Sequence, residues 1–268
     1  MTTSPPASSG MPGSSDWSSI EEIAGVVRTC TKCRLHAGRT NAVPGAGSSV
    51  ASILIIGEGP GFNENQQGLP FVGRSGKLLD ELLAAVPLSR EDVFITNVVK
   101  CRPPDNRDPQ PDAVSACRPY LARQLELINP KVVVTLGRHS YLRFYPDGKI
   151  SRDHGKILQW NDRILFPLYH PAAGLRNPAI KRELQEDVLR LPEALRESLR
   201  ITTAAVREVN EVPYQPEQVA AQPPTSIHVQ TAPEFSPEEV KAGASLSEPV
   251  IENETTEKEG GERQLGFF

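Results

Sequence analysis

The sequence has no long apolar stretch. None of its 268 residues belongs to a run that approaches the roughly 20 apolar residues needed to cross a bilayer. Its first residues, MTTSPPASSGMPGSSDW, also lack the basic start and the apolar centre of a signal peptide. These absences argue against a membrane or exported protein, and we expect no membrane association and a cytoplasmic location.

Cysteine is scarce, with four in the chain, and internal repeats are absent. The small number of cysteines excludes a disulfide-rich scaffold, and the lack of repeats excludes a solenoid. Two phosphate-binding fingerprints are missing as well. The turn GEGPG (57–61) is followed by Phe62 where a dinucleotide fingerprint needs glycine, and no Gly-Lys-Ser/Thr follows it.

Positive charge also looks scarce, because the formal net charge is −4. The average hides an asymmetry. Residues 201–268 hold 12 acidic and 4 basic side chains, which leaves 21 acidic and 25 basic side chains in residues 1–200. The first 200 residues are therefore mildly basic, which is compatible with contacts to phosphate groups.

Composition divides the chain into three parts. Residues 1–16 are mostly Ser, Pro, Gly and Thr, and residues 201–268 are rich in Pro and Glu, so we expect both to be disordered. Residues 17–200 contain enough apolar side chains for one sizeable core, and we expect a single domain there.

Within that domain, strands and helices alternate. Short apolar runs predict strands at 51–57, 92–99, 131–137 and 163–170. Apolar residues at helical spacing predict a helix capped by Ser75, a helix over 112–128, and a last helix from Pro178 through Leu191. This order is typical of an α/β fold with a mostly parallel sheet between helices. Ligands of such folds bind beyond the carboxyl ends of the strands.

The four cysteines are interpreted as one site. Cys30 and Cys33 form a C-x-x-C pair, Cys101 follows the second strand, and Cys117 lies on the next helix. Four thiolates suit a tetrahedral zinc ion or an iron–sulfur cluster, and the spacing does not choose between them. Disulfides, buried free thiols or a redox pair are the other interpretations, and the expected location disfavours disulfides.

Three polar or aromatic residues fall where the strands end. Asn97 ends the second strand and offers an amide donor and a carbonyl acceptor, which match O4 and N3–H of uracil but not cytosine. Phe71 lies in a Pro- and Gly-flanked loop where a ring could stack on a base. His170 follows the fourth strand and could donate to an oxygen that gains negative charge. Each has an ordinary structural interpretation by itself.

Together with the cysteines, these segments resemble the family 4 (type A) uracil-DNA glycosylases over about residues 17–198. The matching segments are Cys30-x-x-Cys33, GEGPG, GLPFVGRSG, ITNVVKCRPPDNR, Cys117 and HPAA. The resemblance implies a three-layer α/β/α sandwich and a monofunctional N-glycosyl hydrolase that removes uracil from DNA in base-excision repair. It also implies that the four cysteines hold a structural [4Fe–4S] cluster.

The resemblance further implies a role for particular side chains. Glu58 and Gly59 would form the pocket wall, Phe71 would stack on uracil, and Asn97 would read its edge. His170 would stabilise the departing anion, and Asn106 would lie beside the site. Family 1 enzymes have a water-activating Asp where this chain has Gly59, so Glu64 is our candidate for positioning water or stabilising the cationic sugar.

Contacts with DNA are expected around this pocket. The target base must be extruded from a duplex to be reached. Leu175 or Arg176, just after HPAA, could fill the space it leaves. Lys100, Arg102 and Arg107 are candidate phosphate contacts.

The last five residues carry a separate hypothesis. The acidic tail ends in a mainly apolar segment, which consists of Gln264, Leu265, Gly266, Phe267 and Phe268. It resembles the short peptides that dock on the bacterial sliding clamp, and we expect clamp binding by an otherwise monomeric protein. A chance apolar terminus is the other interpretation.

Two other functions remain open from the sequence alone. One is a non-catalytic nucleic-acid-binding module in which the cysteines hold zinc. The other is a glycosylase of the same superfamily that acts on another lesion, such as hypoxanthine.

Overall fold

The computed structural model describes residues 17–210, with side chains up to residue 201. These residues belong to the first of two units, Met1–Tyr214, and the second, Gln215–Phe268, lies outside the described residues. The strands are β1 Ala46–Gly47, β2 Ile53–Gly57, β3 Val93–Asn97, β4 Val132–Leu136, β5 Leu158–Trp160 and β6 Arg163–Leu168. The α-helices are α1 Ile20–Thr29, α2 Phe62–Gln67, α3 Arg74–Ala84, α4 Pro111–Ile128, α5 Arg138–Tyr141, α6 Ile150–Asp153, α7 Pro171–Gly174, α8 Pro178–Val188 and α9 Leu191–Asn210, and two 3₁₀ turns are η1 Arg34–Gly38 and η2 Pro104–Asn106.

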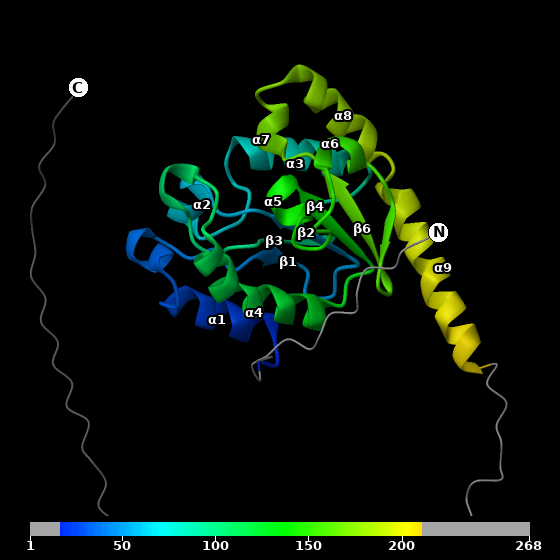
Figure 1. Ribbon diagram of the computed structural model, residues 1–268, viewed down its shortest axis with the longest axis horizontal. Helices are drawn as coiled ribbons and strands as arrows, with labels where there is room; N and C mark the ends of the chain where they lie inside the picture. The colour runs from blue at the N-terminus through cyan, green and yellow to red at the C-terminus, as the bar shows by residue number, and fades with distance from the viewer. Residues whose placement is uncertain (1–16, 211–268) are drawn as a thin grey trace, which may run out of the picture. The chain divides into compact units, whose positions relative to one another are not determined.

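The strands form one mixed sheet in the order β1-β3-β2-β4-β6-β5. The four central strands are parallel, as the sequence predicts, and the short edge strands β1 and β5 pair antiparallel. Helices cover both faces of this sheet, with α1 and α4 on one side and α3, α7 and α8 on the other (Figure 1). The expected three-layer α/β/α sandwich is confirmed.

Each face of the sheet has its own apolar core, because successive residues of a strand point to opposite sides. Leu54 and Ile56 of β2 pack toward α1 and α4. Ile53 and Ile55 pack toward α3 and α8. All four are buried, and burying a side chain of this size contributes about 1.5–3 kcal/mol.

The register of the sheet decides where the functional residues meet. Gly57 at the end of β2 is paired with Asn97 at the end of β3, and Leu136 of β4 is paired with Leu168 of β6. The carboxyl ends of the parallel strands therefore lie at one edge, and His170 follows there, two residues after β6.

Two helix predictions need correction. Helix α3 is capped by Gly73 rather than Ser75, because Glu64 accepts the Val72 and Gly73 N–H groups and the helix begins at Arg74. The expected last helix is two helices, since α8 ends at Val188 and Leu191 begins α9. Pro192 has no N–H with which to continue the hydrogen bonding of α8.

Helix α9 runs to Asn210, ten residues past the domain end that composition suggests at residue 200. Residues 1–16 and 211–268, for which we expect disorder, lie outside the described residues. Within residues 17–210, no helix is both long and apolar enough to cross a membrane.

Candidate active site

The seven residues predicted to bind the substrate or to take part in the reaction line a single open cleft of about 640 Å³. They are Glu58, Gly59, Glu64, Phe71, Asn97, Asn106 and His170. They come from the loop after β2, helix α2, the segment between α2 and α3, the end of β3, turn η2 and the segment after β6. The cleft therefore lies at the carboxyl edge of the parallel strands, where the sequence predicts it.

Asn97 presents an unused hydrogen-bond acceptor to this cleft. Its side chain is 1% exposed, and its Oδ1 has no hydrogen-bond partner. A Cβ on Gly57 would lie 2.3 Å from Oδ1, so only glycine fits beside the amide. A buried acceptor without a partner costs about 1–3 kcal/mol, which a ligand donor can recover.

His170 is held as a neutral hydrogen-bond donor. It caps α7, and the Ala172 N–H donates to its Nδ1 at 3.1 Å. The proton of the neutral ring therefore lies on Nε2. Burial, together with the nearby Arg176, lowers the pKa of His170 to about 4, and Glu64 acts in the opposite direction.

The ring of Phe71 stacks against His170, with 5.7 Å between centroids and 28° between planes. Phe71 has a φ of +53°, a left-handed conformation that is unfavourable for a bulky residue. Two neighbours stabilise it. Arg90 donates to the carbonyl oxygens of Pro70 and Phe71, and Gly76 has no Cβ to collide with Phe71 O.

Glu64 lies on α2, and its carboxylate is fixed by the loop before α3. Oε1 accepts from the Val72 N–H at 2.9 Å and the Gly73 N–H at 2.8 Å. The second oxygen, Oε2, lies beside Gly61, where a Cβ would approach it to 2.6 Å. The carboxylate is therefore oriented in the cleft by main-chain donors.

Two residues that the sequence analysis missed stand beside Glu58. Atoms of Glu58, Asp108 and His139 that could each bind a metal ion lie within 4.8 Å of one another, and His139 Nε2 is 2.9 Å from Asp108 Oδ2. Burial raises the pKa of Glu58; His139 and Arg138 oppose this, and Asp108 adds to it. No short-range signal in the sequence connects positions 58, 108 and 139, because the loop after β2, the loop after η2 and helix α5 bring them together.

The polar rim of the cleft is formed by the loop after Cys101. Asn106 Oδ1 accepts from Arg102 Nε at 2.8 Å, and Arg107 forms an exposed ion pair with Asp105 at 3.0 Å. Arg176 also lines the cleft, and Leu175 beside it is partly exposed. These side chains are accessible to a phosphate backbone.

Lys100 is not such a contact, and this prediction was wrong. The side chain is 1% exposed, and its Nζ donates to Thr96 Oγ1, Asn97 O and Gln124 Oε1 at 2.6–2.8 Å. Burial lowers the pKa of Lys100 to about 7. It is an internal link between β3 and α4.

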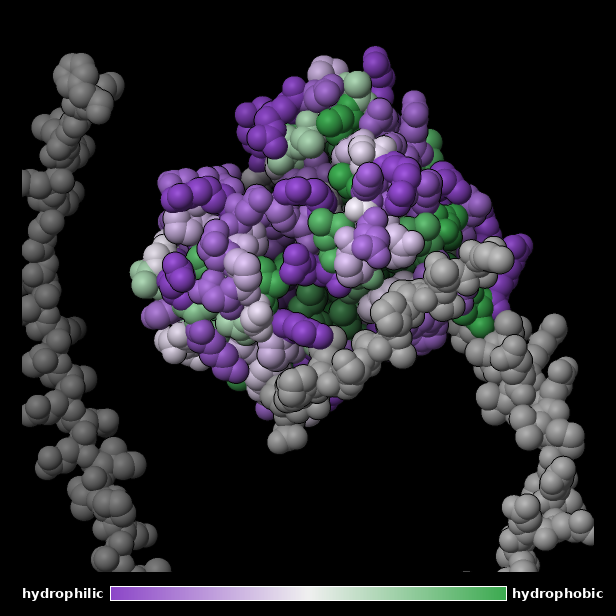
Figure 2. Space-filling model, viewed as in Figure 1, coloured by the Kyte–Doolittle hydropathy of each residue, from purple (hydrophilic) through white to green (hydrophobic). Residues whose placement is uncertain are grey.

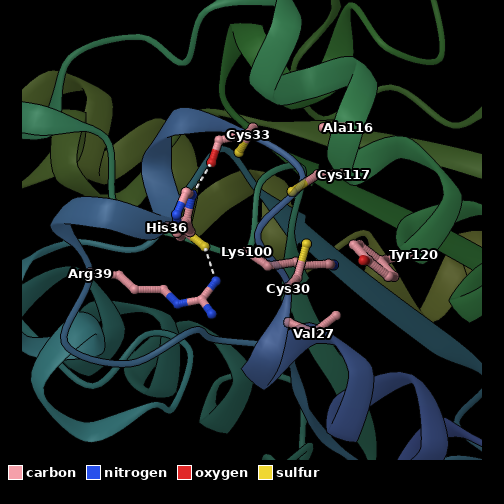
Figure 3. A pocket seen from close by; sticks show the side chains of 10 residues that line it. Val27, Cys30, Cys33, His36, Arg39, Lys100, Ala116, Cys117 and Tyr120 are labelled. Carbon is pink, nitrogen blue, oxygen red and sulfur yellow. Dashed lines mark hydrogen bonds between the residues drawn. The ribbon is translucent and has the colours of Figure 1, made fainter.

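The four cysteines meet in one small pocket, shown in Figure 3. Cys30 and Cys33 flank the turn between α1 and η1, Cys101 follows β3, and Cys117 lies on α4. None forms a disulfide. The fold thus brings all four thiols into one pocket, as the sequence predicts.

The chemistry of this pocket fits a metal–thiolate group. Burial raises the pKa of the Cys101 thiol and raises that of Cys117 to about 11, so their thiolates need a compensating cation. Arg39 Nη1 donates to Cys101 Sγ at 3.2 Å, and the Lys32 N–H donates to Cys30 Sγ at 3.5 Å. Hydrogen bonds to sulfur of this kind also surround iron–sulfur clusters.

Similar proteins support the same interpretation of the chain. The model of the uracil DNA glycosylase superfamily matches residues 44–191. The chain belongs to this superfamily. The type-4 uracil-DNA glycosylase of Saccharolobus solfataricus is 52% identical over 186 residues, which cover 66% of this chain and 86% of that protein.

Two further relatives are less similar to this superfamily member. The type-4 uracil-DNA glycosylase of Archaeoglobus fulgidus is 45% identical over 184 residues, covering 65% of this chain and 92% of that protein. The type-5 uracil-DNA glycosylase of Pyrobaculum aerophilum is 30% identical over 148 residues, covering 48% and 65%. The expected superfamily, fold and enzyme class are therefore confirmed, which argues against a non-catalytic module.

Proposed function

We propose that this member of the superfamily removes uracil from DNA by hydrolysing the N-glycosidic bond, with the cleft as the uracil pocket. The observation that carries the proposal is the unpartnered Oδ1 of Asn97. It accepts from uracil N3–H, and the amide nitrogen donates to O4. Cytosine has no N3–H and carries a donor at C4, so it would leave the buried acceptor unpaired.

His170 stabilises the leaving base. As the bond breaks, negative charge develops on uracil O2, and the Nε2–H of His170 is the donor that we assign to it. A neutral imidazole is suited to this task because its donor is in place without a proton transfer from solvent. The low pKa keeps the ring neutral at ordinary pH.

The other cleft residues place the base and the sugar. Phe71 stacks on uracil, while Glu58, Gly59 and Asn106 form the pocket wall. The fixed carboxylate of Glu64 stabilises the positive charge on the sugar or positions the attacking water.

The target nucleotide reaches this cleft by extrusion from the DNA. Leu175 or Arg176 fills the space left in the stack, and Arg107 in the cleft lining and Arg102, bonded to Asn106, contact phosphates. This assignment places the DNA across the rim of the cleft, above Asn97 and His170.

We assign the four cysteines to a [4Fe–4S] cluster, which is supported by the donor set, the hydrogen bonds to sulfur and the likeness to type-4 enzymes. When bound, the cluster serves as a structural cross-link. Cys30 and Cys33 tie α1 and η1 to the segment after β3 and to α4, and this segment leads directly to the rim residues Arg102 and Asn106.

Iron is distinguished from zinc by a brown preparation with visible charge-transfer absorption and about four iron atoms per chain. A colourless protein with stoichiometric zinc contradicts the cluster. It leaves the uracil pocket untouched, because the pocket assignment does not use the metal.

The reaction is tested on a labelled oligonucleotide with one uracil, using wild type, Asn97→Ala and His170→Ala. We expect strand breakage after alkali with wild type and a loss of about 100-fold or more in each variant. Leu189→Ala, a substitution at an exposed site away from the cleft, is the control. Wild-type protein with its full metal content that leaves uracil in place but excises hypoxanthine identifies another lesion as the substrate.

We also propose that the C-terminal residues dock on a sliding clamp. These residues, Gln264, Leu265, Phe267 and Phe268, lie outside the described residues, and the proposal rests on their sequence. Deleting 264–268 should abolish clamp binding without changing uracil excision, and a synthetic tail peptide should compete with the full chain. A full-length protein that does not bind the clamp contradicts it.

A further inference from the structure

Phe62 is an exposed aromatic residue at the mouth of the cleft. It is the first residue of α2, it lines the cleft, and its side chain is 58% exposed. The face of the described surface shown in Figure 2 is mainly hydrophilic, with small separate apolar areas. The uracil contacts assigned above do not involve Phe62, because Asn97, Phe71 and His170 make them.

A cation is placed against this ring. The guanidinium carbon of Arg102 lies 5.4 Å from the centroid of the Phe62 ring, and Arg102 Nε is held by Asn106 Oδ1 at 2.8 Å. Arg102 therefore braces one side of the aromatic ring. The exposed fraction shows that much of the remaining ring surface stays open to a ligand.

Three arginines near Phe62 offer cations to a polyanion, in a cleft that the carboxylates of Glu58, Glu64 and Asp108 also line. Arg74, Arg107 and Arg176 line the same cleft. An open aromatic ring within a groove that carries several cations is the usual arrangement for single-stranded nucleic acid, in which bases stack on rings and cations follow the backbone. A base next to an extruded nucleotide has lost a stacking partner, so it gains most from a new one.

We propose that Phe62, braced by Arg102, is a stacking platform for the nucleobase adjacent to the extruded uridine in single-stranded DNA. The proposal rests on the proposed function, because uridine in the pocket brings its neighbour to the rim. It assigns Phe62 to substrate binding rather than to bond cleavage. The effect should therefore appear in KM and in DNA affinity, with kcat retained.

The test uses the full chain with its metal and single-stranded oligonucleotides in which the base on the 5′ or the 3′ side of uracil is replaced by an abasic analogue. We expect Phe62→Ala to raise KM about tenfold on the unmodified oligonucleotide, the size typical of one base–aromatic stack. Removing the platform base should cost wild type the same factor and cost Phe62→Ala nothing.

Matched variants separate stacking from other effects. Phe62→Tyr should retain the wild-type KM, whereas Phe62→Leu, which is apolar but has no aromatic face, should resemble Phe62→Ala. Leu189→Ala removes an equally exposed side chain, also 58%, away from the cleft and should behave as wild type. Unchanged melting temperature and iron content show that each variant is folded.

Equal KM values for wild type and Phe62→Ala overturn the proposal, as does an equal penalty in both proteins when either neighbouring base is removed. Fluorescence anisotropy with a uracil-free thymine oligonucleotide distinguishes this failure from failure of the proposed function. If wild type excises no uracil, weaker binding by Phe62→Ala supports base stacking on Phe62 and contradicts only its position beside an extruded uridine, and equal binding overturns the platform itself.

Discussion

The side chain of Lys100 donates to the main-chain oxygen of Asn97 at 2.8 Å. Lys100 directly precedes Cys101 of the metal pocket, and Asn97 is the residue assigned to read uracil, so this bond joins the two sites. The same Nζ also donates to Gln124 Oε1 of α4. Cys117 lies on the same helix, about two turns before Gln124. The buried side chain of Lys100 therefore connects the metal pocket with the substrate pocket.

Lys100→Met should destabilise the protein, because it leaves three buried acceptors without their shared donor. We expect the midpoint of thermal unfolding to fall by about 5 °C or more, which corresponds to about 2 kcal/mol for a domain of this size. Lys181→Met is the control, since Lys181 forms only a half-exposed ion pair with Glu81 at 3.5 Å. Equal melting temperatures of the two variants would show that the Lys100 network contributes little.

Arg90→Ala should weaken uracil binding although Arg90 is outside the cleft lining. It removes the donors that hold the carbonyl groups of Pro70 and Phe71, so the Phe71 ring loses its fixed position. We expect kcat/KM for uracil DNA to fall about tenfold. Arg190→Ala removes a comparable bond, to Gly155 O at 2.6 Å, and should lower stability without changing KM. An unchanged KM in Arg90→Ala contradicts this positioning role.

His170 should make the folded protein less stable in acid. The folded state keeps the ring neutral down to about pH 4, while the unfolded chain takes up a proton near the ordinary pKa of 6.5. Between these values the unfolded state binds more protons, so stability falls as the pH falls, by about 3 kcal/mol over the whole interval. Wild type should thus lose more stability than His170→Gln between pH 7.5 and 4.5 in urea unfolding. Parallel losses in the two proteins would refute a folded state that keeps His170 neutral.

Asp108→Asn should shift the titration of Glu58. The carboxylate of Asp108 helps to raise the pKa of Glu58, so its removal should lower that pKa. Where activity depends on ionised Glu58, the acid limb of the pH profile of kcat/KM therefore moves to lower pH. Asp105→Asn changes an exposed carboxylate of the same loop, paired with Arg107, and should leave the profile in place. Identical shifts in both variants would indicate a general charge effect instead.

Local patterns in the sequence predicted the central strands, the helix over 112–128 and the set of residues at the strand ends. These features depend on neighbours a few positions apart, because apolar periodicity and the turn-forming residues act over that range. The gathering of the four cysteines was predicted from residue type instead, because four thiolates with one C-x-x-C pair suit a single metal site. Spacing did not separate iron from zinc.

Only the tertiary structure decided which of these groups are free, paired or buried. The sequence placed Asn97 at the end of a strand, but the register beside Gly57 left its Oδ1 without a partner. The sequence offered Lys100 as a surface cation, and packing against α4 made it an internal donor. Contacts such as Arg90 with Phe71, or Glu58 with His139, join positions 19 or more residues apart. They arise from the parallel register and from loop closure, which no short window of sequence contains.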